Sequence, residues 1–597
     1  MGAGGCVSSG GTGMICRPPT IAPIIRLEFV LPETLRGKAI GIGRRPLNSE
    51  INIGLIAHLP FTQNCEDRTG SGYVVESHNI EHTTDGPGGE LMAAAAFNGL
   101  NSGIKIERHP RLNFGRDAFS IAVWVKTNRL TDVVGDIVSK FDLDARRGFN
   151  LGIITNTGVT TTTQPNYRNI HFGIDNAKLS DRWTDCGRPG RAVQILSLAA
   201  IRGNLYAGTT ELEAGETGHL WRYAEDGEWT DLGAAPEGCN SVTSIAEYEG
   251  ALHCCTGRYN PVGSRLGPPK NERPGGRVYR VEPDGTWIEC GHPGSQDAVP
   301  EETPTMGYET GKADEAMSLT VYRGELYVTS NHRRGAFKYE SDGHWKRIGP
   351  NERIMSFTVY RDRLYALING GPVYRYEGGD QWTYCGTPAR STQTYGAVTY
   401  QDNLYVGTWP ECEVLRYGGG EAWVNVGRVG YEREVMALAL YNGKVYLGTL
   451  PMGNVWRMDQ EDFTFVGNLD NTPTVFLRRV WSMAVYQGKL FGGTLPSGHV
   501  LSIEAGRMAT HDHSLEAGWR HIAAVRDESC LKLYLDGRPV ATSSTYSSND
   551  YDLSNDAPLK IGFGNSHRFH GSMCDLRTYG RAISPHEILQ LSDQAHA

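Results

Sequence analysis

The feature that most constrains this chain is a short apolar phrase, typified by Leu-Tyr-x-Gly-Thr, that occurs seven times. The copies are spaced 47, 74, 38, 40, 41 and 45 residues apart and begin at Asn204, Ala251, Glu325, Arg363, Asn403, Lys444 and Lys489. A period of about 40–50 residues is typical of units that cannot bury their apolar faces alone and must pack on their neighbours. The seven copies are therefore predicted to form one structure. The spacing of 74 marks a long insertion in the second copy.

Most of the repeats contain four short phrases with the composition of β-strands. A phrase such as SLAAI or SMAVY comes first, the Leu-Tyr-x-Gly-Thr phrase follows a turn, and a phrase related to VYRY is third. A tryptophan phrase comes last, with Trp229, Trp287, Trp345, Trp382 and Trp423. Four strands per unit predict a β-propeller of seven blades. A solenoid of similar period is the alternative, although solenoid repeats usually carry one strand or a helix pair.

The segments on either side of the repeats alternate apolar and polar residues but lack the repeated phrases. The first segment contains HLPF, AFNG and FSIAVWVKT, and the second contains GWRHIAAV, KLYLDG, IGFG and HGSMCDLRTYGRAIS. Together these phrases resemble the laminin-G-like, concanavalin-type jelly roll. The closing pattern of that family matches at Phe569, Gly571, Asp575, Arg577, Tyr579, Arg581 and Ala582, with Ile583 in place of the final Leu. The resemblance implies a domain that binds glycans or acts as a spacer.

The predicted fold is all-β, a seven-bladed β-propeller inserted into a discontinuous jelly-roll β-sandwich. Residues 181–505 form the propeller, and residues 51–180 and 506–597 form the first and second parts of the sandwich. Insertion suits a propeller because a ring of blades brings its own ends together. Residues 1–50 are expected to be a tail and a lead-in. Ser584 followed by Pro585 predicts a short N-capped helix near the end of the chain.

Composition excludes several classes of function. The chain has 58 basic and 67 acidic residues, a net charge of -9, which argues against binding along a nucleic-acid backbone. No apolar run is long enough for a spanning helix. The N-terminal residues lack the features of a secretory signal, so we expect a cytoplasmic protein, or an exported one whose signal is missing from this sequence. Twelve cysteines occur without a CxxC pair, and the sequence requires no cofactor, although a structural Ca²⁺ is compatible with it.

The first phrase of each repeat is expected to form the innermost strand, where equivalent positions from all repeats meet around the axis. The position three residues before the recurrent small residue holds, in order, Gln194, Ser241, Glu315, Arg353, Gln393, Glu434 and Arg479. Two acids, two arginines and two amides on one ring are typical of a ligand site. A solvated channel rim with no ligand is the alternative.

The loops after the Leu-Tyr-x-Gly-Thr phrases are expected to surround the same axis and to add further polar groups. They contain Arg258, Tyr259, His332, Arg333, Arg334, Trp409 and Glu411. Guanidinium groups bind carboxylates in a bidentate manner, and an indole packs against the apolar face of a pyranose. The set therefore favours an oligosaccharide or polysaccharide that carries acidic sugars.

These residues predict a carbohydrate-active protein, and the first candidate is a polysaccharide lyase acting on uronate-containing glycans. In β-elimination an arginine such as Arg353 would offset charge on the substrate carboxylate while His332, Tyr259 or Tyr395 removes the C5 proton. Propellers of similar architecture include such lyases and some glycosidases, which is a likeness of fold alone. A glycoside hydrolase using Glu315 and Glu434 is the second candidate. A non-catalytic glycan-binding or scaffold protein is the third.

Overall fold

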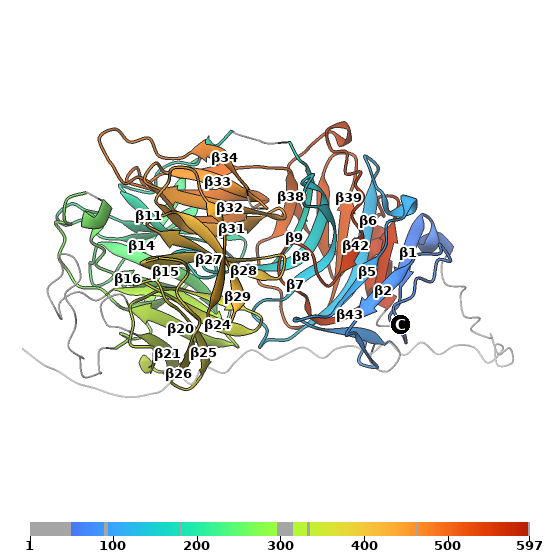
Figure 1. Ribbon diagram of the computed structural model, residues 1–597, viewed down its shortest axis with the longest axis horizontal. Helices are drawn as coiled ribbons and strands as arrows, with labels where there is room; N and C mark the ends of the chain where they lie inside the picture. Colours follow the sequence, from blue (N-terminus) through green and yellow to red (C-terminus); the bar gives the residue numbers. More distant parts are fainter. Residues whose placement is uncertain are drawn as a thin grey trace, which may run out of the picture. The chain divides into compact units, whose positions relative to one another are not determined.

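The computed structural model describes residues 49–88, 93–178, 182–264, 266–294, 315–330, 335–460 and 462–594. The chain divides into two compact units, residues 1–52 and residues 53–597. In the first unit a short 3-10 helix, η2, covers Ser49–Asn52. The remaining elements belong to the second unit, which is an all-β structure with a β-propeller arrangement (Figure 1).

Four of the central repeats each form a separate four-stranded antiparallel sheet, with the first phrase as the innermost strand. The third repeat has β19 (Ala316–Tyr322), β20 (Glu325–Ser330), β21 (Ala336–Ser341) and β22 (His344–Gly349). The fourth has β23 (Ile354–Tyr360), β24 (Arg363–Ile368), β25 (Val373–Gly378) and β26 (Gln381–Tyr384). The fifth has β27 (Gln393–Tyr400), β28 (Asn403–Trp409), β29 (Glu413–Gly419) and β30 (Ala422–Arg428). The sixth has β31 (Glu434–Tyr441), β32 (Lys444–Leu450), β33 (Asn454–Asp459) and β34 (Asp462–Asn468).

The seventh repeat is completed by a strand from the other end of the propeller segment. Its sheet has the order β10-β37-β36-β35, with β10 (Thr184–Asp185), β35 (Arg479–Tyr486), β36 (Lys489–Leu495) and β37 (Val500–Ile503). The outermost strand thus precedes the first repeat in the sequence. This arrangement explains why the seventh repeat has no tryptophan phrase of its own, since Trp183 stands directly before β10.

The number of separate blades is five, which corrects the predicted seven. The first two repeats are β11 (Gln194–Ile201), β12 (Asn204–Thr210), β13 (His219–Tyr223) and β14 (Trp229–Ala234), then β15 (Ser241–Tyr248), β16 (Ala251–Gly257), β17 (Val278–Val281) and β18 (Trp287–Glu289). Both belong to a 15-stranded sheet that also contains sandwich strands. The connections are single pairs, Thr210 with Ser241 between β12 and β15, and Ala200 with Asn166 between β11 and β9 (Asn166–Asn176).

The tryptophan and cysteine positions that recur in the repeats form hydrogen bonds between neighbouring repeats. The indole of Trp345 donates to the carbonyl of Cys290 in the preceding repeat (2.7 Å), and the indole of Trp423 donates to Cys385 (2.8 Å). Trp229 of the first repeat donates to Cys186, directly after β10 (2.8 Å), and the Tyr486 hydroxyl donates to Gly203 (3.2 Å). The first and last repeats therefore contact each other and close the ring.

The sandwich has two sheets, and each draws strands from both flanks, so blue and red segments interleave in Figure 1. One sheet has β1 (Leu55–Leu59), β3 (Glu81–Thr83), β4 (Ala94–Asn98), β6 (Phe119–Thr127), β39 (Gly518–Arg526), β40 (Leu531–Leu535), β41 (Arg538–Thr542) and β43 (His570–Tyr579). The other has β2 (Val75–His78), β5 (Gly103–Ile106), β7 (Gly135–Asp142), β8 (Arg147–Asn156), β9, β38 (Arg507–His511) and β42 (Leu559–Ile561). Alternate residues of β6 and β9, such as Ile121 and Phe172, fill the core between the sheets.

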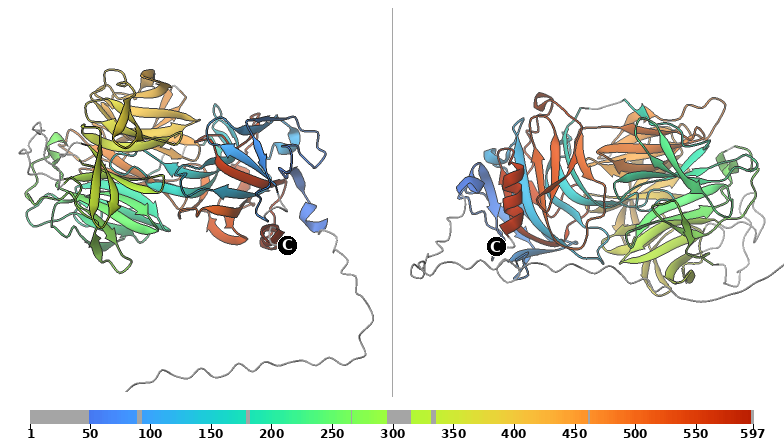
Figure 2. Two further views of the ribbon diagram at one scale, coloured as in Figure 1. Left: turned by 90° about the horizontal axis from the view of Figure 1, so that it is seen from below. Right: turned by 180° about the vertical axis from the view of Figure 1, so that it is seen from behind.

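Three short 3-10 helices and one α-helix complete the described structure: η4 (Pro110–Leu112), η5 (Pro261–Ser264), η6 (Ser548–Asp550) and α1 (Pro585–Asp593). The predicted helix near the C-terminus is confirmed. The Ser584 hydroxyl accepts from the backbone N–H of Glu587, whose carboxylate accepts from the Ser584 backbone, forming a capping box. Figure 2 shows α1 lying against the sandwich strands, where Leu589 and Ser592 approach Gly537 after β40.

The loop between β8 and β9 fills the axis of the propeller, and we call residues 157–165 the axial loop. Every residue of this loop is buried. The Thr161 hydroxyl donates to the carbonyl of Leu196 (2.6 Å), and Ser318 N–H donates to the Thr161 carbonyl (3.1 Å). Ala397 N–H donates to the Gly158 carbonyl (2.7 Å). One sandwich loop thus contacts the inner strands of the first, third and fifth repeats.

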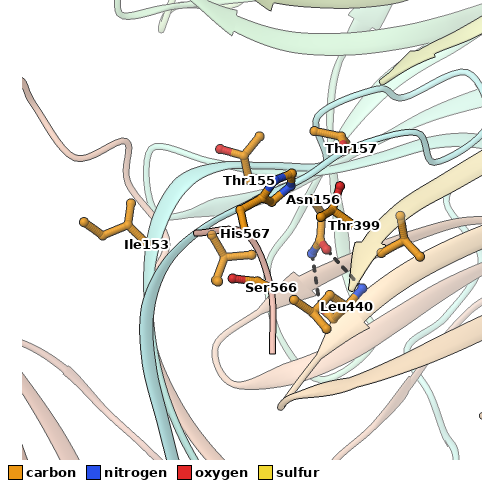
Figure 3. A pocket seen from close by; sticks show the side chains of 10 residues that line it. Ile153, Thr155, Asn156, Thr157, Thr399, Leu440, Ser566 and His567 are labelled. Carbon is orange, nitrogen blue, oxygen red and sulfur yellow. Dashed lines mark hydrogen bonds between the residues drawn. The ribbon is translucent and has the colours of Figure 1, made fainter. Parts of the chain in front are cut away.

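Three carboxamides in and beside the axial loop each pair with a backbone residue on the free edge of an inner strand. Asn156 accepts from Leu440 N–H (3.0 Å) and donates to its carbonyl (3.3 Å), as Figure 3 shows. Asn166 makes the same two contacts with Val485, at 3.0 and 2.6 Å. Gln164 makes them with Val321, both at 2.8 Å. Each side-chain amide therefore forms the two backbone hydrogen bonds that a residue of a neighbouring strand would otherwise form.

Loss of these amides is expected to destabilise the whole second unit. In the double variant Asn156→Ala/Asn166→Ala, the buried backbone groups of Leu440 and Val485 lose their partners, which costs about 1–3 kcal/mol for each site. Urea denaturation followed by tryptophan fluorescence is expected to show the loss. Asn425→Ala, at an exposed position on β30, is the matched control and is expected to change the free energy of unfolding by about 0.5 kcal/mol or less. Equal effects of the two changes would contradict a structural role of the axial loop.

Candidate functional site

The seven positions aligned from the sequence lie at the same end of the inner strands, and we call them the axial ring. Gln194, Ser241, Gln393, Glu434 and Arg479 are the first residues of β11, β15, β27, β31 and β35, while Glu315 and Arg353 directly precede β19 and β23. Glu315 and Gln194 are fully buried, and Glu434 is 3% exposed. Arg353 and Gln393 are half-buried.

An apolar layer lies directly beneath the axial ring. In six of the seven strands the residue two positions further on, at or next to a β-bulge, is apolar or aromatic. Their side chains form one buried cluster of Leu196, Met317, Met355, Tyr395, Met436 and Trp481. The indole of Trp481 donates to Thr161 of the axial loop (3.4 Å), and the Thr160 hydroxyl donates to the Met436 carbonyl. The axis is therefore filled from the axial ring down to the sandwich.

Two tyrosines sit among the charged groups of the axial ring. The Tyr395 hydroxyl accepts a hydrogen bond from the Asn369 carboxamide (2.9 Å). Burial raises the pKa of Tyr395, and Glu434 raises it further, while Arg353 and Arg479 oppose the increase. Burial likewise raises the pKa of Tyr259, against the effect of Arg479. The structure thus brings Tyr259 and Tyr395 together with the ring, in an environment that favours the neutral phenol.

The buried environment of the ring alters the protonation of Glu434. Burial raises the pKa of Glu434 to about 8, and the nearby guanidinium of Arg479 opposes that increase. The carboxyl group is therefore largely protonated at neutral pH and is able to donate a proton or a hydrogen bond.

The other predicted residues are placed less centrally. Arg258 and Tyr259 are half-buried in the connection that follows β16, and Glu411 is exposed after β28. Trp409 is half-buried beside the apolar layer, and the guanidinium of Arg433 lies 5.0 Å from the centre of its ring. His332, Arg333 and Arg334 lie outside the described residues.

Sequence reasoning missed the apolar layer apart from Tyr395, and it missed Asn369, Arg433 and the axial loop. The apolar layer was detectable, because the same alignment that found the ring gives it at two residues further on. Asn369 and Arg433 stand in loops whose lengths and sequences differ between repeats. No periodic signal marks them, so only the structure connects them with Tyr395 and Trp409.

Two cavities lie where the sandwich meets the propeller. One, of about 10 Å³, is lined by Ile153–Thr157 together with Val398, Thr399, Leu440, Ser566 and His567 (Figure 3). It is large enough for about one water molecule. A groove of about 490 Å³ is bordered by residues that include Asp142, Gln401, Tyr405, Arg416, Asn425 and Lys560. Neither cavity is lined by a residue that the sequence singled out.

These observations define an all-β protein that combines a β-propeller with a concanavalin-like sandwich. Residues 500–589 match the Laminin_G_3 family, of the concanavalin A-like lectin/glucanases superfamily. This match confirms the type of domain predicted for the second flank. A comparison with curated proteins gives no match.

Several solved structures are similar to 54% of the chain. A streptogramin B lyase is 10% identical, with 96% of its chain covered and a TM-score of 0.40. A catalytically inactive virginiamycin B lyase from Staphylococcus aureus with quinupristin is 10% identical, with 98% covered and a TM-score of 0.39. YCF48 from Cyanidioschyzon merolae is 10% identical, with 98% covered and a TM-score of 0.38. Likeness at this level supports no argument about function.

Within the described residues, no group of three or more His, Cys, Asp or Glu side chains is arranged to hold a metal ion. No helix in that part of the chain is long and apolar enough to cross a membrane.

The raised pKa of Glu434 predicts a pH dependence of stability. A carboxyl group with a folded pKa near 8 and an ordinary value of 4.5 favours the folded state at low pH. That contribution is lost as the pH rises from about 4.5 through about 8, because the unfolded state releases its proton first. Glu434→Gln is therefore expected to match the parent protein near pH 4.5 and to be more stable by a few kcal/mol near pH 9.

Thermal unfolding measured across this pH range tests the prediction. Glu421→Gln, a change at an exposed position, is the control and is expected to leave the pH profile unchanged. A parallel pH profile for Glu434→Gln and the parent protein would show that Glu434 is ionised in the folded state.

Proposed function

We propose that this chain is a carbohydrate-active protein that binds a uronate-containing glycan at the axial ring and cleaves it by β-elimination. The proposal rests on one observation, the convergence of Arg353 and Arg479 with a protonated Glu434 and with Tyr259 and Tyr395 around a single axis. Two guanidinium groups beside a neutral acid favour a ligand that carries a carboxylate and a leaving oxygen.

The proposed reaction assigns a role to each of these groups. Arg353 and Arg479 bind the carboxylate on C5 and stabilise the charge that develops there as the C5–H bond breaks. The proton passes to His332, Tyr259 or Tyr395, the electron pair forms the C4=C5 double bond, and the C4–O bond breaks. Glu434 donates its proton to the departing glycosidic oxygen. Because the environment keeps Tyr259 and Tyr395 neutral, a tyrosine acts as the base only once bound substrate changes that environment.

Hydrolysis is the second candidate, and the protonation of Glu434 favours it as well. An inverting or retaining glycosidase needs one carboxyl group with a raised pKa as the acid and a second carboxylate as the base or nucleophile. Glu434 would be the acid, and Glu315 of the same ring would be the partner.

We further propose that all seven repeats act as blades around this axis, with residues 181–505 inserted into the sandwich. Support comes from the ring itself, since each repeat, including the two in the 15-stranded sheet, contributes one residue at the equivalent strand end.

Incubation with acidic oligosaccharides is expected to separate these candidates. Absorbance from an unsaturated product would support the lyase, and new reducing ends without absorbance would support the hydrolase. Binding without either product would support the third candidate, a non-catalytic glycan-binding or scaffold protein.

Arg353→Gln is expected to weaken binding of an acidic oligosaccharide by about tenfold or more, since a hydrogen bond to a charged group contributes about 1.5–3 kcal/mol. Titration calorimetry measures the affinity, and circular dichroism checks the fold. Arg390→Gln, at an exposed position before β27, is the control and is expected to bind as the parent does. Unchanged binding by Arg353→Gln would place the glycan site elsewhere.

A further inference from the structure

Exposed apolar side chains gather at the axial-ring end of the sixth and seventh repeats. Tyr431, just before β31, is 97% exposed. Phe476, before β35, is 52% exposed, and Met452, after β32, is 45% exposed. All three lie in connections at the strand ends that carry Glu434 and Arg479. Large exposed apolar groups that cluster beside a polar site are typical of a surface that binds a ligand or a partner.

Contacts place Trp409, Arg433, Met452 and Arg478 along one surface that begins at the fifth repeat. Arg433 lies over the Trp409 ring, and its N–H donates to the Leu450 carbonyl (2.8 Å). Met452 N–H donates to the carboxylate of Glu432 (3.3 Å), the residue that follows Tyr431 in the sequence. Arg478 contacts the Met452 sulfur (3.5 Å). Tyr431 and Phe476 stand two positions before Arg433 and Arg478 in the sequence. We call the six residues together the outer arc: Trp409, Arg433, Tyr431, Met452, Arg478 and Phe476.

The outer arc alternates apolar groups with guanidinium groups. Aromatic faces pack against the apolar faces of pyranose rings, and guanidiniums bind carboxylates. A chain of acidic sugars presents both features in alternation along its length. A protein partner would also use Tyr, Met and Arg, but the arc runs directly into the axial ring, which contains further arginines. This continuity favours a single ligand that extends from the ring over the arc.

We propose that the outer arc binds additional sugar residues of the same acidic glycan, so that the ligand is an oligomer or polymer extending from the axial ring over the fifth to seventh repeats. This inference rests on the proposed function and adds the chain length and direction of the substrate. Tyr431 and Phe476 would stack on sugar rings, and Arg433 and Arg478 would bind their carboxylates.

The test measures affinity against chain length with the full-length protein. Oligogalacturonates of one to about six sugars are titrated calorimetrically against the parent, against Tyr431→Ala/Phe476→Ala, and against Phe465→Ala. Phe465 is 51% exposed on the outer strand β34, away from the arc, and serves as the matched control. The parent is expected to bind longer chains more tightly. The double variant is expected to lose about threefold to tenfold affinity for each stacking ring with long chains, while keeping the affinity for the shortest ligand.

Other outcomes overturn one or both proposals. Parent affinity that does not change with chain length, or an equal loss in Phe465→Ala, would overturn the outer arc but leave the axial ring as a uronate site. Failure of every chain length to bind the parent would overturn the proposed function and this inference together. Binding of a protein to the arc in a purified complex, with oligogalacturonates unable to compete, would assign the arc to a protein partner and reject the glycan track.

Discussion

The backbone hydrogen bonds of the innermost strands are the constraint on which the rest of this structure depends. Each inner strand pairs along its length with one neighbour, and β11 and β15 have only a single further pair on the other edge. The rest of that edge faces the axis, where unpaired N–H and C=O groups would be costly. Asn156, Gln164 and Asn166 satisfy part of that edge, each by pairing with both backbone groups of one residue. The sandwich and the propeller are therefore joined at the centre of the ring as well as at its surface.

The filled axis determines the chemistry available at the other end. Because Met355, Met436, Trp481 and their neighbours lie beneath the ring, the polar side chains above them are held in an environment poor in water. Such an environment strengthens electrostatic interactions and alters protonation. The raised pKa of Glu434 is one result. In a channel open to solvent, Glu434 would keep an ordinary pKa. The sandwich thus influences the protonation of the ring through the layers that lie between them.

Much of the architecture follows from sequence patterns, and the exceptions have physical reasons. The all-β fold, the propeller and the concanavalin-like domain were predictable, because their strands follow period-2 patterns. The axial loop was not, since TGVTTTTQP has the composition of an exposed turn, and only its position buries it. The number of separate sheets was predicted wrongly because single pairs such as Thr210 with Ser241 merge repeats without a sequence signal. The ring positions were found by alignment, whereas their protonation depends on burial.

The order of strands in the sandwich has a consequence for the synthesis of the chain. Strand β6 lies between β43 and β39, and both are translated only after all of the propeller strands. During that interval Phe119, Ile121 and Val123 have no partner strands and present an apolar edge open to aggregation. Early docking of β7–β9, the other sheet of the sandwich, would cover part of this nascent apolar surface.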